Sequence, residues 1–142
     1  MKNLKINKKI ISDRGKLIEL YSERLKEMKK LPKGKFALPD NFAVGAYNLR
    51  CALEATFDIC AHILSRIPGA QVAEYKQMAI EMGRQKIVPM EFAEKNLYKM
   101  AGYRNRLTHF YFEVTPKEMY EIIQKRLGDF EVFLKHIKKI LK

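Results

Sequence analysis

The sequence predicts an all-α protein, an antiparallel, up-and-down bundle of about five helices. Apolar residues recur at the three- and four-residue spacing of helices along most of the chain. Proline and glycine divide this pattern into segments with short connections, which favours antiparallel neighbouring helices. No segment has a convincing strand pattern. With 142 residues, 47% of them apolar, residues 1–142 are expected to form a single domain with its own core.

The first two helices are expected on either side of a break rich in proline and glycine. The first runs from about residue 4 to residue 30 and ends at "LPKGKFALP". The second begins near Pro39, because proline fits the first turn of a helix, where its missing N–H would have no partner. It continues to about residue 66, where "IPGAQ" ends it.

Three further helices complete the prediction. A short one covers about residues 72–82 and ends at Gly83, and the next begins around Pro89 and enters the polar stretch near residue 103. In "VTPKE", Thr115 is expected to cap the fifth helix and Pro116 to occupy its first position. Apolar spacing carries this helix to about residue 141, so the second and fifth helices should be among the longest.

Composition limits the classes of partner and location. The net charge of +12, from 28 Lys+Arg against 16 Asp+Glu, favours a polyanionic partner such as RNA, an acidic protein or a membrane surface. A solubilising lysine coat is the alternative. No signal peptide is visible, and no stretch approaches the ~18 apolar residues of a membrane span. Cys51 and Cys60 resemble core fillers rather than a disulfide framework, so we expect a cytoplasmic protein without membrane association.

Metal and cofactor sites are not expected. The three histidines, His62, His109 and His136, are far apart in sequence, and no pair of histidines or cysteines has the spacing of metal ligands. The stretch "PKGKF" lacks the spacing of a phosphate-binding glycine loop.

The second predicted helix carries a polar ladder opposite its apolar face. Its members follow one another at four-residue spacing: Arg50, Glu54, Asp58 and His62. One interpretation is a solvent-exposed face of weak ion pairs. Small and apolar residues border the ladder, however, which favours a face covered by a second subunit.

The stretch "YRNRLTHFYFEV", residues 103–114, concentrates polar chemistry at the end of an amphipathic helix. On a helix, Asn105 and His109 share a face, with Arg106 beside them, whereas Arg104 lies about 140° from His109. Arg104 and His109 converge if the helix ends just before His109, or if a two-fold partner brings a second copy close. Histidine can move a proton near neutral pH and arginine can hold a phosphate. These groups suffice for metal-free RNA cleavage, although a structural hydrogen-bond cluster is the simpler interpretation.

The same stretch resembles the signature of the HEPN superfamily, specifically its HepT-like branch. That signature is an arginine, a polar residue, four to six residues and a histidine, followed in this branch by a tyrosine two residues later. This sequence has Arg104, Asn105, His109 and Tyr111 at those positions. "LRCALEATFDICAHIL" and "VTPKEMYEIIQKRLGDFEVF" are similar to the family's second and last helices. The resemblance covers about residues 40–135.

The resemblance implies a toxin of a type VII toxin–antitoxin system, a homodimer that cleaves RNA, and not DNA, without a metal. The implied antitoxin is a minimal nucleotidyltransferase that transfers AMP from ATP to the motif's tyrosine. Carried over to this sequence, Arg104 and His109 are catalytic, Asn105 and Arg106 support them, and Tyr111 accepts AMP.

Two further expectations accompany the resemblance. The carboxylates of Glu54 and Asp58 should orient Arg104 or Arg106 by ion pairing. The alternative to a toxin is a non-catalytic HEPN partner, or a nucleotide- or RNA-binding module of the nucleotidyltransferase.

Overall fold

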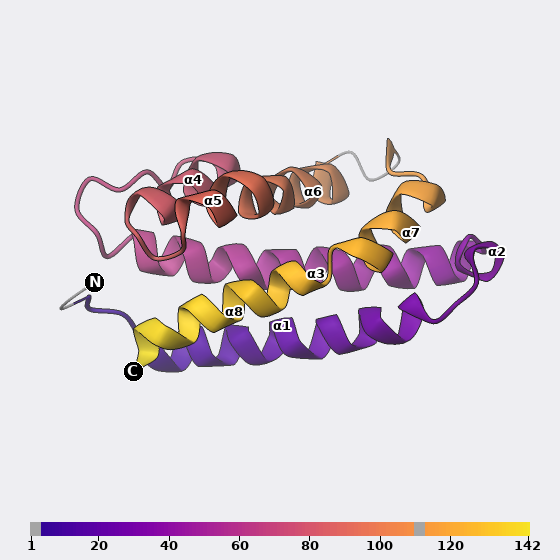
Figure 1. Ribbon diagram of the computed structural model, residues 1–142, viewed down its shortest axis with the longest axis horizontal. Helices are drawn as coiled ribbons and strands as arrows, with labels where there is room; N and C mark the ends of the chain where they lie inside the picture. Colours follow the sequence, from indigo (N-terminus) through magenta and orange to yellow (C-terminus); the bar gives the residue numbers. More distant parts are fainter. Residues whose placement is uncertain (1–3, 110–112) are drawn as a thin grey trace.

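The computed structural model describes residues 4–109 and 113–142, and within these ranges all regular structure is helical, as predicted. Two long helices, α1 (Lys8–Lys29) and α3 (Pro39–Leu64), lie antiparallel and side by side along the length of the molecule (Figure 1). The short helix α2 (Lys33–Phe36) lies in the connection between them. This turn falls inside a segment that was expected to be only a break.

The remaining helices cover α3 and α1. Helix α4 (Tyr75–Arg84) and α6 (Tyr98–His109) pack on α3, on the side away from α1 (Figure 1). Between them, α5 (Met90–Phe92) continues through the π-helical segment η1 (Ala93–Leu97) directly into α6. Helix α7 (Pro116–Lys125) contacts α1, α2 and α3, and α8 (Gly128–Leu141) lies along α1.

Helix boundaries follow from local capping. The side chain of Asn7 accepts hydrogen bonds from the backbone N–H groups of Lys9 and Ile10 and so begins α1. Pro39 occupies the first position of α3. Thr115 caps α7 by accepting a hydrogen bond from the N–H of Glu118 at 3.1 Å, which confirms the predicted cap.

The predicted fifth helix is wrong in one respect, because the chain breaks it into α7 and α8 at residues 126–127. The N–H groups of Asp129 and Phe130 bond to the carbonyls of Arg126 and Leu127, three residues back, in a tighter turn. Gly128 begins the new helix, and glycine is a weak helix former. Consequently α1 and α3, with 22 and 26 residues, are the longest helices described.

Close packing fixes the start of the helix that carries the polar stretch. A Cβ at Gly83, in α4, would lie 2.8 Å from both the Cβ of Ala93 and the Sδ of Met90. Such contacts are too close for any other residue, so glycine allows α4 to approach α5 and η1. Because η1 continues directly into α6, this close contact fixes where α6 begins relative to α4.

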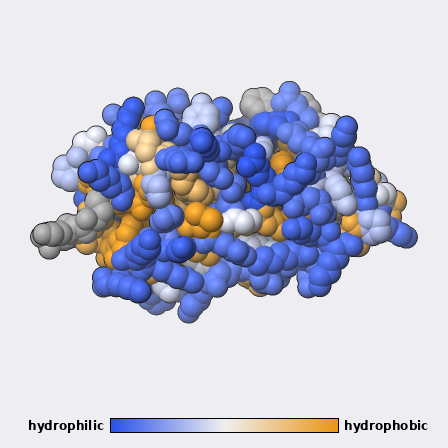
Figure 2. Space-filling model, in the orientation of Figure 1, coloured by the Kyte–Doolittle hydropathy of each residue, from blue (hydrophilic) through white to orange (hydrophobic). Residues whose placement is uncertain are grey.

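No helix among the described residues is long and apolar enough to cross a bilayer. The face shown in Figure 2 is mainly hydrophilic, with hydrophobic residues visible in several places. Both cysteines are free, and Cys60 lies fully inside the core.

Candidate active site

Residues 103–109 of the polar stretch form the last turns of α6, and the first arginine of the stretch is held from two sides. The Nε of Arg104 donates to Oε1 of Glu54, on α3, at 3.0 Å. Its guanidinium carbon lies 3.8 Å from the ring centroid of Tyr75, the first residue of α4. The Arg104 side chain is only 12% exposed. Three helices therefore meet at this arginine.

Glu54 connects α3 to two successive turns of α6. Besides Arg104, its Oε1 accepts a hydrogen bond from the hydroxyl of Thr108 at 3.2 Å. Arg104 and Thr108 are four residues apart and therefore lie on the same face of α6. The predicted ion pair between Glu54 and the motif is confirmed.

Asn105 extends the same cluster. Its Oδ1 accepts a hydrogen bond from Nη1 of Arg104 at 3.3 Å. Asn105 and His109 are four residues apart, so they share a face of α6. The amide therefore links the fixed arginine to the helix face on which His109 lies.

Arg106 has a different partner from the one expected. Its Nη1 and Nη2 donate to the two carboxylate oxygens of Glu118, in the first turn of α7, at 2.5 and 2.8 Å. Nη2 also lies 3.5 Å from the carbonyl oxygen of Glu113. The hydrogen bonds to Glu118 raise the pKa of Arg106 above its ordinary value. The arginine thus joins α6 to the segment that leads into α7.

His109 is the last residue of α6 and is exposed to solvent. Of the two ways in which Arg104 and His109 could converge, a helix that ends just before His109 is therefore not the one observed. Since α6 includes both residues, Arg104 and His109 leave the helix about 140° apart. Tyr111 lies outside the described residues.

The other members of the ladder on α3 have separate partners. Asp58 accepts a hydrogen bond from Nε of Arg14, on α1, at 3.2 Å, so it does not pair with the motif arginines as expected. The Nε2 of His62 accepts a hydrogen bond from the N–H of Asn7 at 2.9 Å. Burial, and then the nearby charge of Arg66, lower the pKa of His62 and favour this neutral acceptor form. The ladder on α3 therefore bonds to α6 through Glu54, and to α1 and its N-cap residue through Asp58 and His62.

A shallow hollow of about 610 Å³ elsewhere on the molecule is larger, but a smaller one lies beside the motif. It has a volume of about 330 Å³ and is lined by Ala46, Tyr47 and Arg50 of α3 and by Leu107 and Thr108 of α6. Its lining combines a cation with an aromatic ring, groups that suit a nucleotide's phosphate and base. Among residues 4–109 and 113–142, no three metal-binding side chains cluster closely enough to hold a metal ion.

Known proteins resemble this chain in sequence and in fold. The model of the family described as Ribonuclease HepT-like matches residues 18–137. The chain belongs to this family. The resemblance of the polar stretch to HepT-like proteins is thereby confirmed, and the match takes in α3, α6 and α7.

Individual relatives agree with the family match. The tRNA nuclease HepT of Aphanizomenon flos-aquae (strain 2012/KM1/D3) is 26% identical over 133 residues, which are 93% of this chain and 90% of that protein. A crystal structure of a toxin–antitoxin with AMP-PNP has a TM-score of 0.82 at 22% identity, covering 92% of this chain and 98% of that one. The tri-AMPylated Shewanella oneidensis HEPN toxin in complex with MNT antitoxin has a TM-score of 0.81 at 24% identity, covering 92% and 97%. At these identities the structures establish the shared fold.

Sequence reasoning missed three side chains of the cluster: Tyr75, Thr108 and Glu118. Thr108 had a detectable signal, since it lies four residues after Arg104 and so faces the same side of the helix. Tyr75 had none, because its contact depends on how α4 packs. Glu118 had only a weak one, as the acidic residue of a capped first turn.

Proposed function

We propose that this protein is the toxin of a type VII toxin–antitoxin system and acts as a metal-independent endoribonuclease. The observation that carries the proposal is the fixed position of Arg104, which Glu54 and Tyr75 hold and which donates to Asn105. Membership of the Ribonuclease HepT-like family and the tRNA nuclease activity named for the cyanobacterial relative support it.

The chemistry follows from the two side chain types. His109 takes the proton of a ribose 2′-hydroxyl, and the 2′-oxygen attacks the adjacent phosphorus. Arg104 donates to the phosphoryl oxygens as negative charge builds on the phosphorane. The bond from phosphorus to the 5′-oxygen breaks, the 5′-oxygen takes a proton, and a 2′,3′-cyclic phosphate remains. DNA lacks the 2′-hydroxyl and is spared.

The contacts of Arg104 leave it capable of this role. A guanidinium has five N–H donors in a fixed fork. Glu54 occupies Nε and Asn105 accepts from Nη1, so these two contacts leave other N–H groups of Nη1 and Nη2 for a phosphate. An arginine fixed before substrate arrives needs little reorganisation in the transition state.

A homodimer would complete the site. Arg104 and His109 diverge around α6, so one chain alone does not direct both side chains to one point. Tyr47, which lines the hollow at Arg50, and Val44, about one turn before it on α3, are 50% and 51% exposed, so this part of α3 offers apolar surface to a partner. A second copy covering this part of α3 would place a second motif close to the first.

Control would come from a minimal nucleotidyltransferase antitoxin that transfers AMP to Tyr111. The Shewanella relative is tri-AMPylated and in complex with an MNT antitoxin, which supports AMP as the modification, and the position of Tyr111 two residues after His109 is the ground for naming it the acceptor. AMP near the motif would bring a phosphate that competes with RNA for the guanidinium donors of Arg104.

The decisive experiment is RNA cleavage by the purified protein with a chelator present. His109→Ala should abolish cleavage, and Arg104→Ala should reduce it by about 10²–10³-fold, as for loss of one transition-state donor. Undiminished cleavage by His109→Ala would remove the motif as the catalyst. A protein that folds and binds the nucleotidyltransferase but never cleaves RNA would establish the alternative, a non-catalytic HEPN partner or nucleotide- or RNA-binding module.

A further inference from the structure

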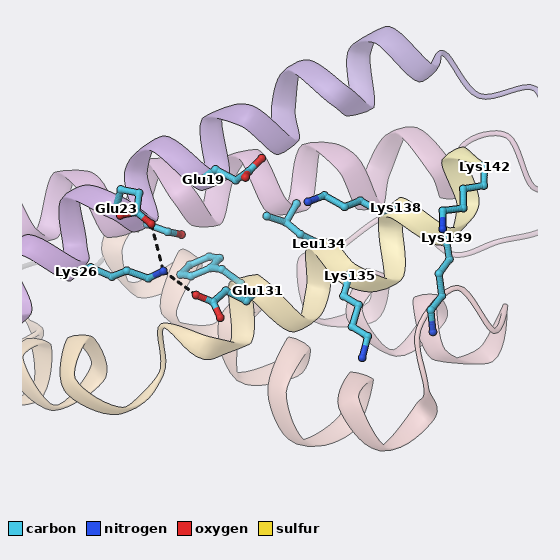
Figure 3. A pocket seen from close by; sticks show the side chains of 11 residues that line it. Glu19, Glu23, Lys26, Glu131, Leu134, Lys135, Lys138, Lys139 and Lys142 are labelled. Carbon is cyan, nitrogen blue, oxygen red and sulfur yellow. Dashed lines mark hydrogen bonds and ion pairs between the residues drawn. The ribbon is translucent and has the colours of Figure 1, made fainter.

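Two hollows flank α8, and their charges differ. The first, about 610 Å³ in volume, lies between α1 and α8 (Figure 3). There Lys26 lies between two carboxylates, 3.2 Å from Glu23 and 2.7 Å from Glu131. Glu19 also lines it, so three carboxylates offset part of the charge of its five lysines, two of which, Lys139 and Lys142, also line the second hollow. The first hollow is therefore the less positive of the two.

The second hollow, about 770 Å³, lies between the end of α8 and the segment that follows α4. We call it the basic hollow, after the basic residues that line it: Arg84, Lys86, His136, Lys139 and Lys142. The described residues that line it include no aspartate or glutamate, and the others are apolar apart from backbone groups.

Its cations differ in how far they are already neutralised. Arg84 lies 3.6 Å from the largely buried carboxylate of Glu81 and is partly offset. Lys86 and Lys139 are exposed, and no ion pair joins either one to another described side chain. Figure 3 shows Lys135 one turn before Lys139 on the same side of α8, so the positive charge continues along the helix. These lysines remain available for an anionic ligand.

The backbone at Lys86 indicates that its side chain is placed there at some expense of stability. Lys86 has a φ of 61°, in the left-handed region that favours glycine, and the other described residue with positive φ is Gly69. The N–H groups of Lys86 and Ile87 bond to the carbonyls of Gly83 and Met82, the pattern that ends many helices with glycine at this position. Glycine would close α4 more comfortably but would leave the basic hollow without this charge.

The local potential is positive around His136 as well. Burial lowers the pKa of His136 first, and the charges of Lys139 and Lys135 lower it further. The neutral imidazole of His136 therefore lies beside a group of cations. A bound anion would reduce the repulsion among these positive charges.

We propose that the basic hollow binds the phosphate backbone of RNA, at a point remote from the cleavage motif. The proposal rests on the proposed function, since its ligand is the RNA substrate. Helix α8 ends where α1 begins, whereas α6 runs toward the opposite end of the molecule, where α7 starts (Figure 1). A folded RNA is large enough to touch both places, and a dinucleotide is not. Unpaired lysines over an open hollow suit a backbone bound by charge rather than by sequence.

The test measures binding of a bacterial tRNA mixture at several salt concentrations, with His109→Ala in every protein to prevent cleavage. Lys86→Gly combined with Lys139→Gln should weaken binding about tenfold or more near physiological salt. It should also lower the slope of log K against log salt by about 0.7–0.9 for each phosphate that the variant no longer neutralises. Lys86→Gly alone should raise the melting temperature while it weakens binding. Lys33→Gln, at an exposed lysine on α2, has the same charge change as Lys86→Gly alone and should leave tRNA binding and the melting temperature almost unchanged.

Several outcomes overturn the proposal: an unchanged salt slope in the double variant, an equal effect of Lys33→Gln, or no tRNA binding at all. Capture by phosphatidylglycerol vesicles through Lys86 and Lys139, without tRNA binding, would replace RNA by a lipid surface.

A cleavage assay separates this proposal from the proposed function. With His109 intact, cleavage of a dinucleotide should be the same in the parent and in the lysine variants, because its single phosphate occupies the cleavage site and leaves none for the basic hollow. Equal losses on the short RNA and on tRNA would overturn the remote site. Lysine-dependent tRNA binding without any cleavage would sustain the basic hollow and refute the ribonuclease.

Discussion

Replacing Tyr75 with leucine removes the aromatic surface that lies 3.8 Å from the guanidinium of Arg104. A cation over an aromatic ring is stabilised by about 0.5–1 kcal/mol when exposed and by about 2 kcal/mol or more when desolvated. The Arg104 side chain is 12% exposed, which places this pair toward the upper value. If one to two kcal/mol of this fixes the arginine for catalysis, cleavage should slow by about 5- to 30-fold, since about 1.36 kcal/mol is tenfold in rate.

The assay is single-turnover cleavage of a short RNA with the protein in excess, measured beside a thermal melt of each variant. Tyr75→Phe keeps the ring and should cleave at close to the parent rate. Tyr98→Leu is the matched control, because the ring of Tyr98 lies 5.3 Å from Lys76, in a cation–π pair away from Arg104. This control should also retain the parent rate.

Three results would refute the reasoning. If Tyr75→Leu cleaves normally, the ring of Tyr75 is not needed to position Arg104. If Tyr75→Phe is as slow as Tyr75→Leu, the hydroxyl and not the ring is what matters. If the loss of rate follows only the loss of folded protein at the assay temperature, then Tyr75 contributes to stability by packing against Phe57 and not to catalysis. The centroids of these two rings lie 5.6 Å apart in an edge-on contact.

Three further predictions concern α7, the acceptor tyrosine and pH. Arg106→Lys and Glu118→Gln should each lower the melting temperature by a few degrees, and the double variant by little more than either, because both break the same pair. Tyr111→Phe should still cleave RNA but take up no AMP from the nucleotidyltransferase and ATP, as mass spectrometry would show; AMP on another tyrosine contradicts the assignment. Burial lowers the pKa values of His62 and His136 below the ordinary 6.5, so the unfolded chain binds protons first, and melts should show stability falling as pH drops below about 6.5. His62→Gln should reduce that fall, and an unchanged fall would assign it to other groups.

The fold was predictable where one element carries its own signal. Apolar spacing and breakers located α3 and α4 to within a few residues, and Thr115 marked the start of α7. The break at residues 126–127 was not predictable in this way, because apolar residues keep helical spacing across it. Only Gly128 hinted at it locally, and an isolated glycine is often tolerated within a helix.

Part of the site was also predictable from the sequence. A carboxylate ladder beside an arginine motif predicted that α3 and α6 exchange an ion pair, and Glu54 with Arg104 confirms it. Which carboxylate pairs with which arginine depends on distances that the sequence does not contain. Asp58 lies one turn further along α3, where α1 packs beside it, and pairs with Arg14.

The two motif arginines, Arg104 and Arg106, contact different helices. Arg104 is tied to α3 and α4, whereas Arg106 is tied to Glu118 and so to α7. A phosphate that displaces nothing can therefore approach the remaining N–H groups of Arg104, but it must compete with a bidentate carboxylate for Arg106. The arrangement favours Arg104 as the donor to substrate. It assigns Arg106 to holding together the two ends of the segment on which Tyr111 lies, since α6 ends at His109 and α7 begins at Pro116.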